Sequence, residues 1–399
     1  YMQVVLENEF LYGYSGARTF LVRPIRPDGC EDALTIVKIG PSEAIRQEFS
    51  NYEAFVKDRL PPVTARIQRP PLALSSYRRA GPAQRAAMQY TFIAEPGRSP
   101  VSLRNALHQN PDPALLQQLF ETFGPNWWMQ RRTATFRVET EYDRLLPPHY
   151  VLQPCVGTRP RNVKLAPSEK TDPASLHLEI GDYVLLKPFQ QIELRADGKS
   201  YSLIGIPQSG RPSLRLRWLD THSPHVNSVV AQVSATRMSL LNQWTTSFDR
   251  FGLPDPTPCL AGLLDQTLTG TRSVIHGDLN LENVLVGPGS LVWLIDFALT
   301  REGHPLFDFA HLESELISHI LAERAASPRA YLALWRSRED PLLNALHAIA
   351  GRCLFDPAHP REYNLALCMA CMGALKYQNL SPLAKHCLYL TAADLSTSL

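Results

Sequence analysis

Hydrophobic and polar residues alternate along much of the first hundred positions, which is the pattern of half-buried β-strands. The stretch "VVLENEFLYGYSGARTFLVRP" reads as two strands joined by a turn with Gly and Ser, and "ALTIVKIG" reads as a third strand. The next segment, "SEAIRQEFSNYEAFV", repeats apolar residues at helical spacing, and "AAMQYTFIAEPG" reads as a buried strand. The pattern predicts a small sheet with one helix packed on it, over residues 1–97.

After residue 98 the pattern is mainly helical, with one β-rich interruption. The stretches "PALLQQLFETFGPNWWMQ" and "VNSVVAQVSATRMSLLNQW" have helical spacing, as does the chain beyond residue 308. Short β-rich runs with Asp-Gly and Ser-Gly turns fill "LHLEIGDYVLLKPFQQIELRADGKSYSLIGIPQSGRPSLRLRWL". We therefore predict an α+β protein, with a helical domain over 98–399 and a β-rich module inserted at 135–222.

Charge changes this picture little. The chain has 40 Lys and Arg against 38 Asp and Glu, so no overall basic field favours nucleic acid. Arg211, Arg215 and Arg217 lie close together in the β-rich region, but residues 151–220 hold ten basic and seven acidic residues. The balance argues against nucleic-acid binding, and we expect a solvated face or a contact surface for a protein partner.

Cysteine usage and hydropathy point to a cytoplasmic protein. The seven cysteines are scattered along the chain and lie mostly among apolar residues, which is typical of reduced thiols. Cys368 and Cys371 form a C-x-x-C pair in an apolar helical stretch, where we expect packing rather than metal or redox chemistry. No apolar run of about 18 residues and no basic leader before an apolar run is present, so we expect no membrane span or signal peptide.

The chemistry is concentrated in "VIHGDLNLENVLVGPGSLVWLIDFA", residues 274–298. Asp278 follows a short apolar run, Asn283 comes five residues later, and Asp296 ends a second apolar run. Carboxylate and amide oxygens are the ligands that Mg²⁺ prefers in proteins. Each residue alone could cap a turn, but together they predict a metal site at the ends of buried strands.

The order H-G-D-x-x-x-x-N, followed by an apolar strand ending in D-F, resembles the catalytic loop of the protein-kinase-like superfamily, in its aminoglycoside and choline phosphotransferase branch. The resemblance implies a bilobal kinase-like fold that binds ATP and Mg²⁺. It makes Asp278 the catalytic base and His276 the residue that packs the catalytic loop. It also makes Asn283 and Asp296 the Mg²⁺ ligands.

The same resemblance implies further parts. Lys38, in the third strand, would contact the α- and β-phosphates, and Glu48 on the next helix would pair with it, with Glu53 as the less favoured choice. Asp308 would brace the catalytic loop through hydrogen bonds. The turn that covers the phosphates would be formed by Gly13, Ser15 and Gly16.

Two departures from the phosphotransferase pattern stand out. Ala298 takes the third position of the D-F-G-like element, and Asn280 stands where those enzymes often have His. Over nearly the whole chain, phrases such as "GYSGARTFLV", "DFAHLESEL" and "KYQNLSPLAKHCLYLTAADL" are similar to a bacterial family called ternary complex associated domains. That similarity implies a kinase-like module of NTP-dependent conflict systems.

Taken together, the sequence predicts an ATP- and Mg²⁺-dependent phosphotransferase that acts on a hydroxyl acceptor, which could be a sugar, an amino alcohol, a nucleoside or a protein side chain. The alternatives are a nucleotide-binding signalling module that transfers nothing and an interaction platform with a vestigial cleft. Trp127 and Trp128 could stack on a substrate, but two tryptophans at a helix end are more often core residues.

Overall fold

The computed structural model describes residues 1–10, 17–61, 65–74, 85–91, 100–146, 241–242 and 244–399, and the backbone of the strands between 149 and 233. The chain divides into two compact units, Tyr1–Thr135 with Thr269–Leu367, and Phe136–Leu268 with Cys368–Leu399. Both units combine helices and sheets, in agreement with the mixture of helices and strands predicted from the sequence. The domain boundaries at 97 and at 135 and 222 stay predictions.

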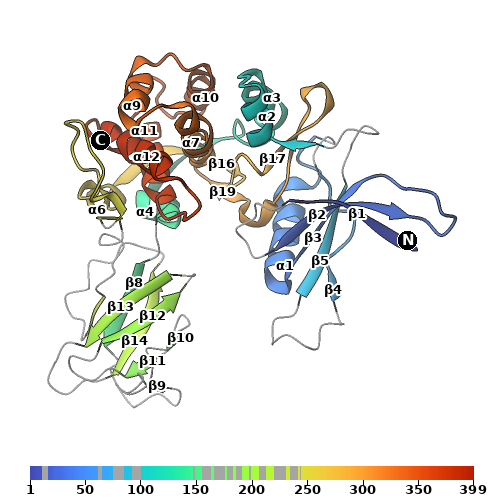
Figure 1. The fold of residues 1–399 in the computed structure, drawn as a ribbon, viewed down its shortest axis with the longest axis horizontal. Helices are drawn as coiled ribbons and strands as arrows, with labels where there is room; N and C mark the ends of the chain where they lie inside the picture. The colour runs from blue at the N-terminus through green and yellow to red at the C-terminus, as the bar shows by residue number, and fades with distance from the viewer. Residues whose placement is uncertain are drawn as a thin grey trace. The chain divides into compact units, whose positions relative to one another are not determined.

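A five-stranded antiparallel sheet forms the N-terminal part of the first unit (Figure 1). Its central strands are buried on one face, with Leu21, Ile36 and Met88 at most 2% exposed, which explains the alternation in the sequence. In sheet order the strands are β1 (Gln3–Phe10), β2 (Arg18–Ile25), β3 (Thr35–Pro41), β5 (Arg85–Thr91) and β4 (Leu72–Leu74).

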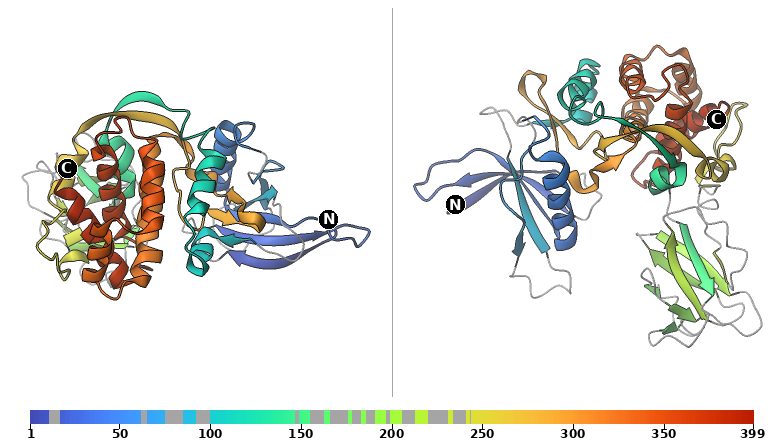
Figure 2. Two further views of the ribbon diagram at one scale, coloured as in Figure 1. Left: turned by 90° about the horizontal axis from the view of Figure 1, so that it is seen from above. Right: turned by 180° about the vertical axis from the view of Figure 1, so that it is seen from behind.

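One helix runs beside this sheet (Figure 2). Helix α1 (Ser42–Asn51) follows β3 directly and continues into a π-helical turn, η1 (Tyr52–Val56). Ile45 and Glu48 lie three residues apart on its buried face, so an apolar and a charged side chain both point inward. The direct strand-to-helix connection fixes α1 relative to Lys38 of β3.

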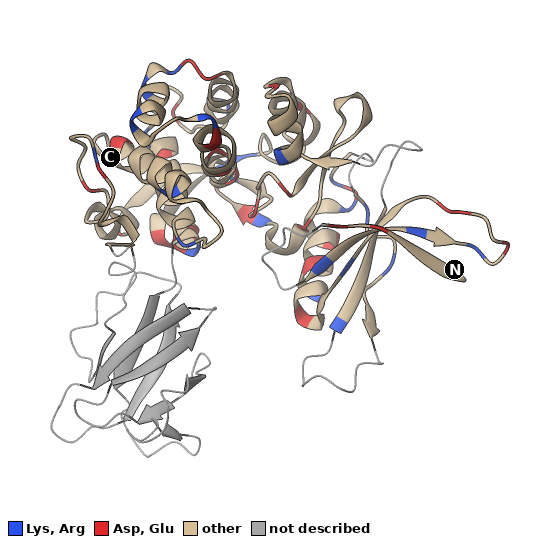
Figure 3. Ribbon diagram, in the orientation of Figure 1, with Lys and Arg blue, Asp and Glu red and all other residues tan. Residues whose placement is uncertain are grey.

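Acidic and basic residues are interspersed along the described elements (Figure 3). On the ribbon formed by β1 and β2, Arg18 pairs with Glu9 at 2.7 Å and Arg23 pairs with Glu7 at 2.6 Å. Solvent-exposed pairs of this kind contribute little to stability. We therefore expect these pairs to add little to the stability of the β1–β2 ribbon.

Two small sheets and a group of helices complete the first unit. The sheets have the orders β18-β17-β6 and β19-β16-β7. Their strands are β6 (Val101–Ser102), β7 (Arg132–Arg137), β16 (Thr267–Ile275), β17 (Val284–Val286), β18 (Val292–Leu294) and β19 (Arg301–Gly303). The helices are α2 (Leu103–Gln109), α3 (Ala114–Phe123), α7 (Pro305–Leu316), η6 (Ile317–Leu321), α8 (Ala322–Arg324), α9 (Pro328–Ser337) and α10 (Pro341–Gly351), with the first turns of α11 (Arg361–Ala374).

A buried polar cluster joins three of these helices. Glu313 of α7 is fully buried and accepts hydrogen bonds from His347 Nε2 of α10 at 2.8 Å and from the Tyr363 hydroxyl of α11. Burial alone would lower the pKa of His347, but the charge and hydrogen bond of Glu313 outweigh it, and the pKa of His347 is raised. The cluster therefore stabilises the folded state most when His347 is protonated.

We expect this cluster to make stability depend on pH. The pKa of His347 is raised in the folded protein. Its contribution to folding stability is therefore fully present below the unfolded-state pKa of about 6.5 and is lost as the pH rises through the folded-state pKa. Urea unfolding would be measured between about pH 5.5 and 8.5. At the acid end of this range, the free energy of unfolding of wild type should exceed that of His347→Gln by about 1.5 to 3 kcal/mol. The difference should shrink at higher pH, and a pH-independent difference would contradict this expectation.

The second unit contains helices and two four-stranded sheets. Its helices are α4 (Val138–Tyr142), α6 (Cys259–Leu264), the last turns of α11 and α12 (Pro382–Ser396). One sheet has the order β8-β14-β11-β9 and the other β10-β12-β13-β15. The strands are β8 (His149–Pro154), β9 (Val163–Leu165), β10 (Leu176–His177), β11 (Tyr183–Leu185), β12 (Gln191–Ala196), β13 (Lys199–Gly205), β14 (Ser213–Leu219) and β15 (Ala231–Val233).

Two observations from the second unit bear on the sequence predictions. Ala231–Val233 lies in a stretch predicted to be helical, but it forms strand β15 and pairs with β13. Cys368, Cys371 and Cys387 are fully buried, and no disulfide joins the cysteines that the structure describes. Both cysteines of the C-x-x-C pair thus belong to the core.

Within the described residues, no helix is long and apolar enough to cross a membrane.

Candidate functional site

The predicted catalytic loop is the connection between two strands of the first unit. It begins at His276, directly after β16, and ends at Asn283, directly before β17. Gly277 has a φ of +79°, and a Cβ atom added there would lie 2.1 Å from the carbonyl oxygen of Leu299. Only glycine fits this position, which gives a physical reason for the Gly between His276 and Asp278.

Asp308 of helix α7 holds the start of the loop. Its carboxylate accepts hydrogen bonds from the backbone N–H of His276 at 2.7 Å, from that of Gly277 at 2.8 Å, and from Trp128 Nε1 at 2.9 Å. The Asp308 side chain is fully buried, so these three donors replace the water that the carboxylate loses. The Trp128 indole is likewise part of the buried loop support rather than a surface for stacking.

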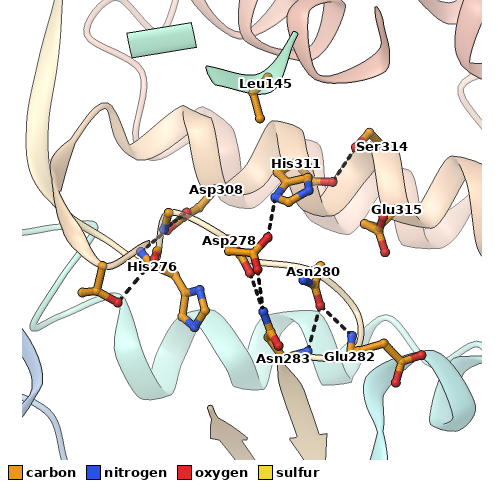
Figure 4. Close-up of polar contacts among 12 residues, drawn as sticks. Leu145, His276, Asp278, Asn280, Glu282, Asn283, Asp308, His311, Ser314 and Glu315 are labelled. Atoms are coloured by element: carbon orange, nitrogen blue, oxygen red, sulfur yellow. Dashed lines mark hydrogen bonds and ion pairs between the residues drawn. The ribbon is translucent and has the colours of Figure 1, made fainter. Parts of the chain in front are cut away.

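Asp278 projects from the loop toward His311 of α7 (Figure 4). Its side chain is 34% exposed, and its Oδ2 accepts a hydrogen bond from Asn283 Nδ2 at 3.1 Å. Asn283 Nδ2 also donates to the Asp278 backbone oxygen at 2.9 Å, and His311 Nδ1 of α7 lies 3.8 Å from Asp278 Oδ1. Asn280 Oδ1 accepts from the backbone N–H groups of Glu282 and Asn283, which closes the turn between the two site residues.

The surroundings raise the pKa of Asp278 to about 6. Loss of hydration in the site is the main cause, and the negative charge of Asp296 adds to it. His276 and the hydrogen bonds from Asn280 and Asn283 act in the opposite direction. A carboxylate with this pKa is a stronger base than an ordinary aspartate and is still mostly ionised near neutral pH.

Lys38 of β3 lies between two carboxylates. Its Nζ is 2.7 Å from Asp296 Oδ2 and 2.9 Å from Glu48 Oε2 of α1, and its side chain is only 5% exposed. Desolvation would lower the pKa of Lys38, but the attraction of Asp296 and then of Glu48 outweighs it, so the pKa is raised and the ammonium stays charged. Glu53, the less favoured partner, pairs with Lys57 instead.

Asp296 has an unusual backbone conformation. It follows β18 with φ 65° and ψ 71°, in the left-handed region, and it precedes the short helix η5 (Phe297–Leu299). Phe297 is fully buried, with its ring centroid 6.1 Å from that of Tyr52 and 6.4 Å from that of Trp127. Burial of Phe297 anchors the turn, so the aspartate before it is held toward Lys38.

His276 lies beneath the loop and not at its surface. Its side chain is fully buried, and its Nε2 is hydrogen-bonded to the carbonyl oxygen of Ile295 at 2.9 Å. Its ring is 5.8 Å from that of Phe297. His276 therefore links this loop to the segment just before Asp296 and is buried beneath it. His304 is also buried, and its Nε2 lies 2.6 Å from Glu362 Oε1.

The oxygen donors of the site could hold a hard cation. Among the described residues, no group of three or more His, Cys, Asp or Glu side chains is arranged to bind a metal. Asp296 and Asn283 offer one carboxylate and one amide oxygen, and Mg²⁺ typically takes one or two protein ligands together with substrate phosphates and waters. The residues present thus fit a metal that arrives with a nucleotide.

The structure brings together most of the residues predicted from sequence. Lys38, Glu48 and Asp296 form one cluster, and Asp278 contacts Asn283 in the adjoining loop. Gly13, Ser15 and Gly16 lie outside the described residues. Sequence analysis missed Asn51, whose amide donates to the backbone of residues 297 and 298. Its position three residues after Glu48, on the same helix face, is the only signal that could have found it.

Comparison with known proteins gives one family match and several similar structures. The model of a family described as ternary complex associated domain 9 matches residues 2–340, which include both the five-stranded sheet and the loop of residues 276–283. Curated protein sequences give no match.

The similar solved structures include three of aminoglycoside phosphotransferase APH(4)-Ia. An apo thermostable mutant of that protein is 11% identical, with a TM-score of 0.41, over 98% of this chain and 95% of that one. A ternary complex of such a mutant with ADP and hygromycin B is 12% identical, also with a TM-score of 0.41, over 98% of this chain and 94% of that one.

Proposed function

The chain belongs to the ternary complex associated domain 9 family, and we propose that it is a kinase-like phosphotransferase that moves the γ-phosphoryl group of Mg²⁺·ATP to a hydroxyl acceptor. The observation that carries this proposal is the cluster of Lys38, Glu48 and Asp296 beside the half-buried Asp278. Phosphoryl transfer needs positioned charges for the phosphates and one base for the acceptor. These four residues have the chemistry for both tasks.

The nucleotide would use the charged cluster. The ammonium of Lys38, held in place by Glu48, would contact the α- and β-phosphates. Asp296 and the side-chain oxygen of Asn283 would hold Mg²⁺, since the Asn283 nitrogen is engaged with Asp278. When bound, the metal supplies charge neutralisation and orientation of the phosphates. Burying the Lys38 ammonium and its two carboxylates costs desolvation free energy, which favours a functional role for the cluster over a purely structural one.

Asp278 would act on the acceptor. In the proposed reaction the acceptor oxygen forms a bond to the γ-phosphorus, and the bond from that phosphorus to the bridging oxygen of ADP breaks. The hydroxyl proton passes to a carboxylate oxygen of Asp278, whose pKa of about 6 suits it to take a proton near neutral pH. The hydrogen bond from Asn283 fixes the orientation of that carboxylate.

Nucleotide affinity tests this assignment. We expect Lys38→Met to weaken binding of Mg²⁺·ATP by at least about tenfold, because a charge-assisted contact to phosphate is lost. Lys57→Met, which removes an exposed lysine of the same unit, is the matched control and should bind like wild type. Titration calorimetry on variants shown to be folded by circular dichroism makes the comparison. Equal affinities of wild type and Lys38→Met would contradict the assignment.

A second candidate is a nucleotide-binding module that signals its bound state and transfers no phosphate. Ala298 favours it, because it replaces the third residue of the D-F-G-like element and leaves the turn after Asp296 without a glycine. Both candidates require Mg²⁺·ATP binding, so calorimetry does not separate them. Transfer of labelled phosphate to an acceptor separates the two candidates, since only the phosphotransferase needs the base Asp278.

A further inference from the structure

Asn51, the last residue of α1, contacts the turn that follows Asp296. Its Nδ2 donates hydrogen bonds to the carbonyl oxygen of Ala298 at 2.7 Å and to that of Phe297 at 3.3 Å. Its Oδ1 accepts from Gln47 Nε2, one turn earlier on α1, at 2.9 Å. Every polar atom of the Asn51 side chain is thus engaged, and the Gln47 contact turns the donor side toward the carbonyls.

The turn that Asn51 holds is one that needs support. Asp296 occupies the left-handed region, which costs a residue other than glycine free energy and persists only where the surroundings enforce it. The buried ring of Phe297 fixes the turn from one side. The backbone carbonyls of residues 297 and 298 are fixed by Asn51, and the Phe297 carbonyl also accepts from the Thr300 N–H at 3.1 Å.

We propose that Asn51 is a positioning residue for the metal site, which joins helix α1 to the Asp296 turn so that both move as one body. Glu48 and Asn51 lie three residues apart on one face of α1, and they contact the Asp296 region by two separate routes. Glu48 acts through Lys38 on the Asp296 carboxylate, and Asn51 acts directly on the backbone. The inference rests on the proposed function, because it assigns what Asn51 does for Mg²⁺ and nucleotide.

The test compares Asn51→Leu with Asn344→Leu. Both substitutions remove a helical asparagine whose Nδ2 donates to a backbone carbonyl, but Asn344 of α10 donates to Arg338, outside the site. We expect Asn51→Leu to weaken Mg²⁺·ATP binding on the order of tenfold. Asn344→Leu should leave that affinity within about twofold of wild type. Affinity for ATP without Mg²⁺ should change much less in either variant, since Asn51 acts on the metal ligand.

Hydrogen–deuterium exchange in the nucleotide-free proteins gives a second readout. Backbone amides of residues 296–300 should exchange faster in Asn51→Leu than in wild type or Asn344→Leu, because the turn has lost its support. Faster exchange with unchanged Mg²⁺·ATP affinity would overturn the positioning role and leave the proposed function intact. Wild-type protein that binds no Mg²⁺·ATP would overturn the proposed function, and this inference would fail with it.

Discussion

Replacing Asp278 by asparagine is expected to lower the rate of phosphoryl transfer by about 10² to 10⁴ while affinity for Mg²⁺·ATP stays close to wild type. Asparagine keeps the size of the side chain and one oxygen that can accept from Asn283 Nδ2, but it cannot take the proton of the acceptor hydroxyl. The Asp278 carboxylate is one-third exposed and hydrogen-bonded to Asn283, so the substitution requires no rearrangement of the buried part of the loop.

A matched control for this change is available in the same loop. Glu282→Gln makes the same chemical replacement four residues away, at a side chain that lies 3.7 Å from Arg104 and has no role in the proposed reaction. Its maximal rate should stay within about threefold of wild type. The initial rate of label transfer from γ-labelled Mg²⁺·ATP into a fractionated cell extract makes the comparison, and an Asp278→Asn enzyme that transfers label at the wild-type rate would rule out Asp278 as the base.

Replacing Asp308 by alanine is expected to have the largest effect on stability. The change leaves the N–H groups of His276 and Gly277 and the indole of Trp128 buried without an acceptor. Each unsatisfied buried donor costs about 1 to 3 kcal/mol, and partial relaxation should limit the total loss of unfolding free energy to about 3 to 5 kcal/mol.

Asp340→Ala is the control for the Asp308 change. Asp340 is also buried and accepts from two backbone N–H groups, those of Leu342 and Leu343, at the start of α10. Loss of such a helix cap costs about 0.5 to 2 kcal/mol. Urea unfolding should show a larger loss of unfolding free energy in Asp308→Ala than in Asp340→Ala. Equal losses of unfolding free energy would show that Asp308 stabilises the loop no more than an ordinary helix cap does.

Local pattern was enough to predict the elements that hold the site. Alternation predicted the strands around Lys38, and helical spacing predicted α1 with Glu48 on its inward face. Glu48 could be preferred to Glu53 because the apolar residues beyond it share its face of the helix. The motif spacing predicted Asp278, Asn283 and Asp296 as site residues, and the short loop between β16 and β17 brings the first two into contact. The catalytic and metal-binding roles of these residues stay predictions.

Contacts between distant segments could not be predicted in the same way. The hydrogen bond from Trp128 to Asp308 joins residues 180 positions apart, and that from Asn51 to Ala298 joins residues 247 apart. Periodicity reports which face of an element is buried, but not which partner covers it. Strand β15 was predicted as helix because its apolar residues fit both periods, and pairing with β13 decided the outcome.

Transfer of labelled γ-phosphate tests the proposed function most directly. Wild-type protein and Asp278→Asn would each be incubated with Mg²⁺ and γ-labelled ATP in a fractionated cell extract. We expect label to appear in one fraction with wild type and to be nearly absent with Asp278→Asn, which would identify the acceptor as well as the reaction. Saturable binding of ATP with no label transferred in any fraction would contradict the phosphotransferase and favour a nucleotide-binding signalling module.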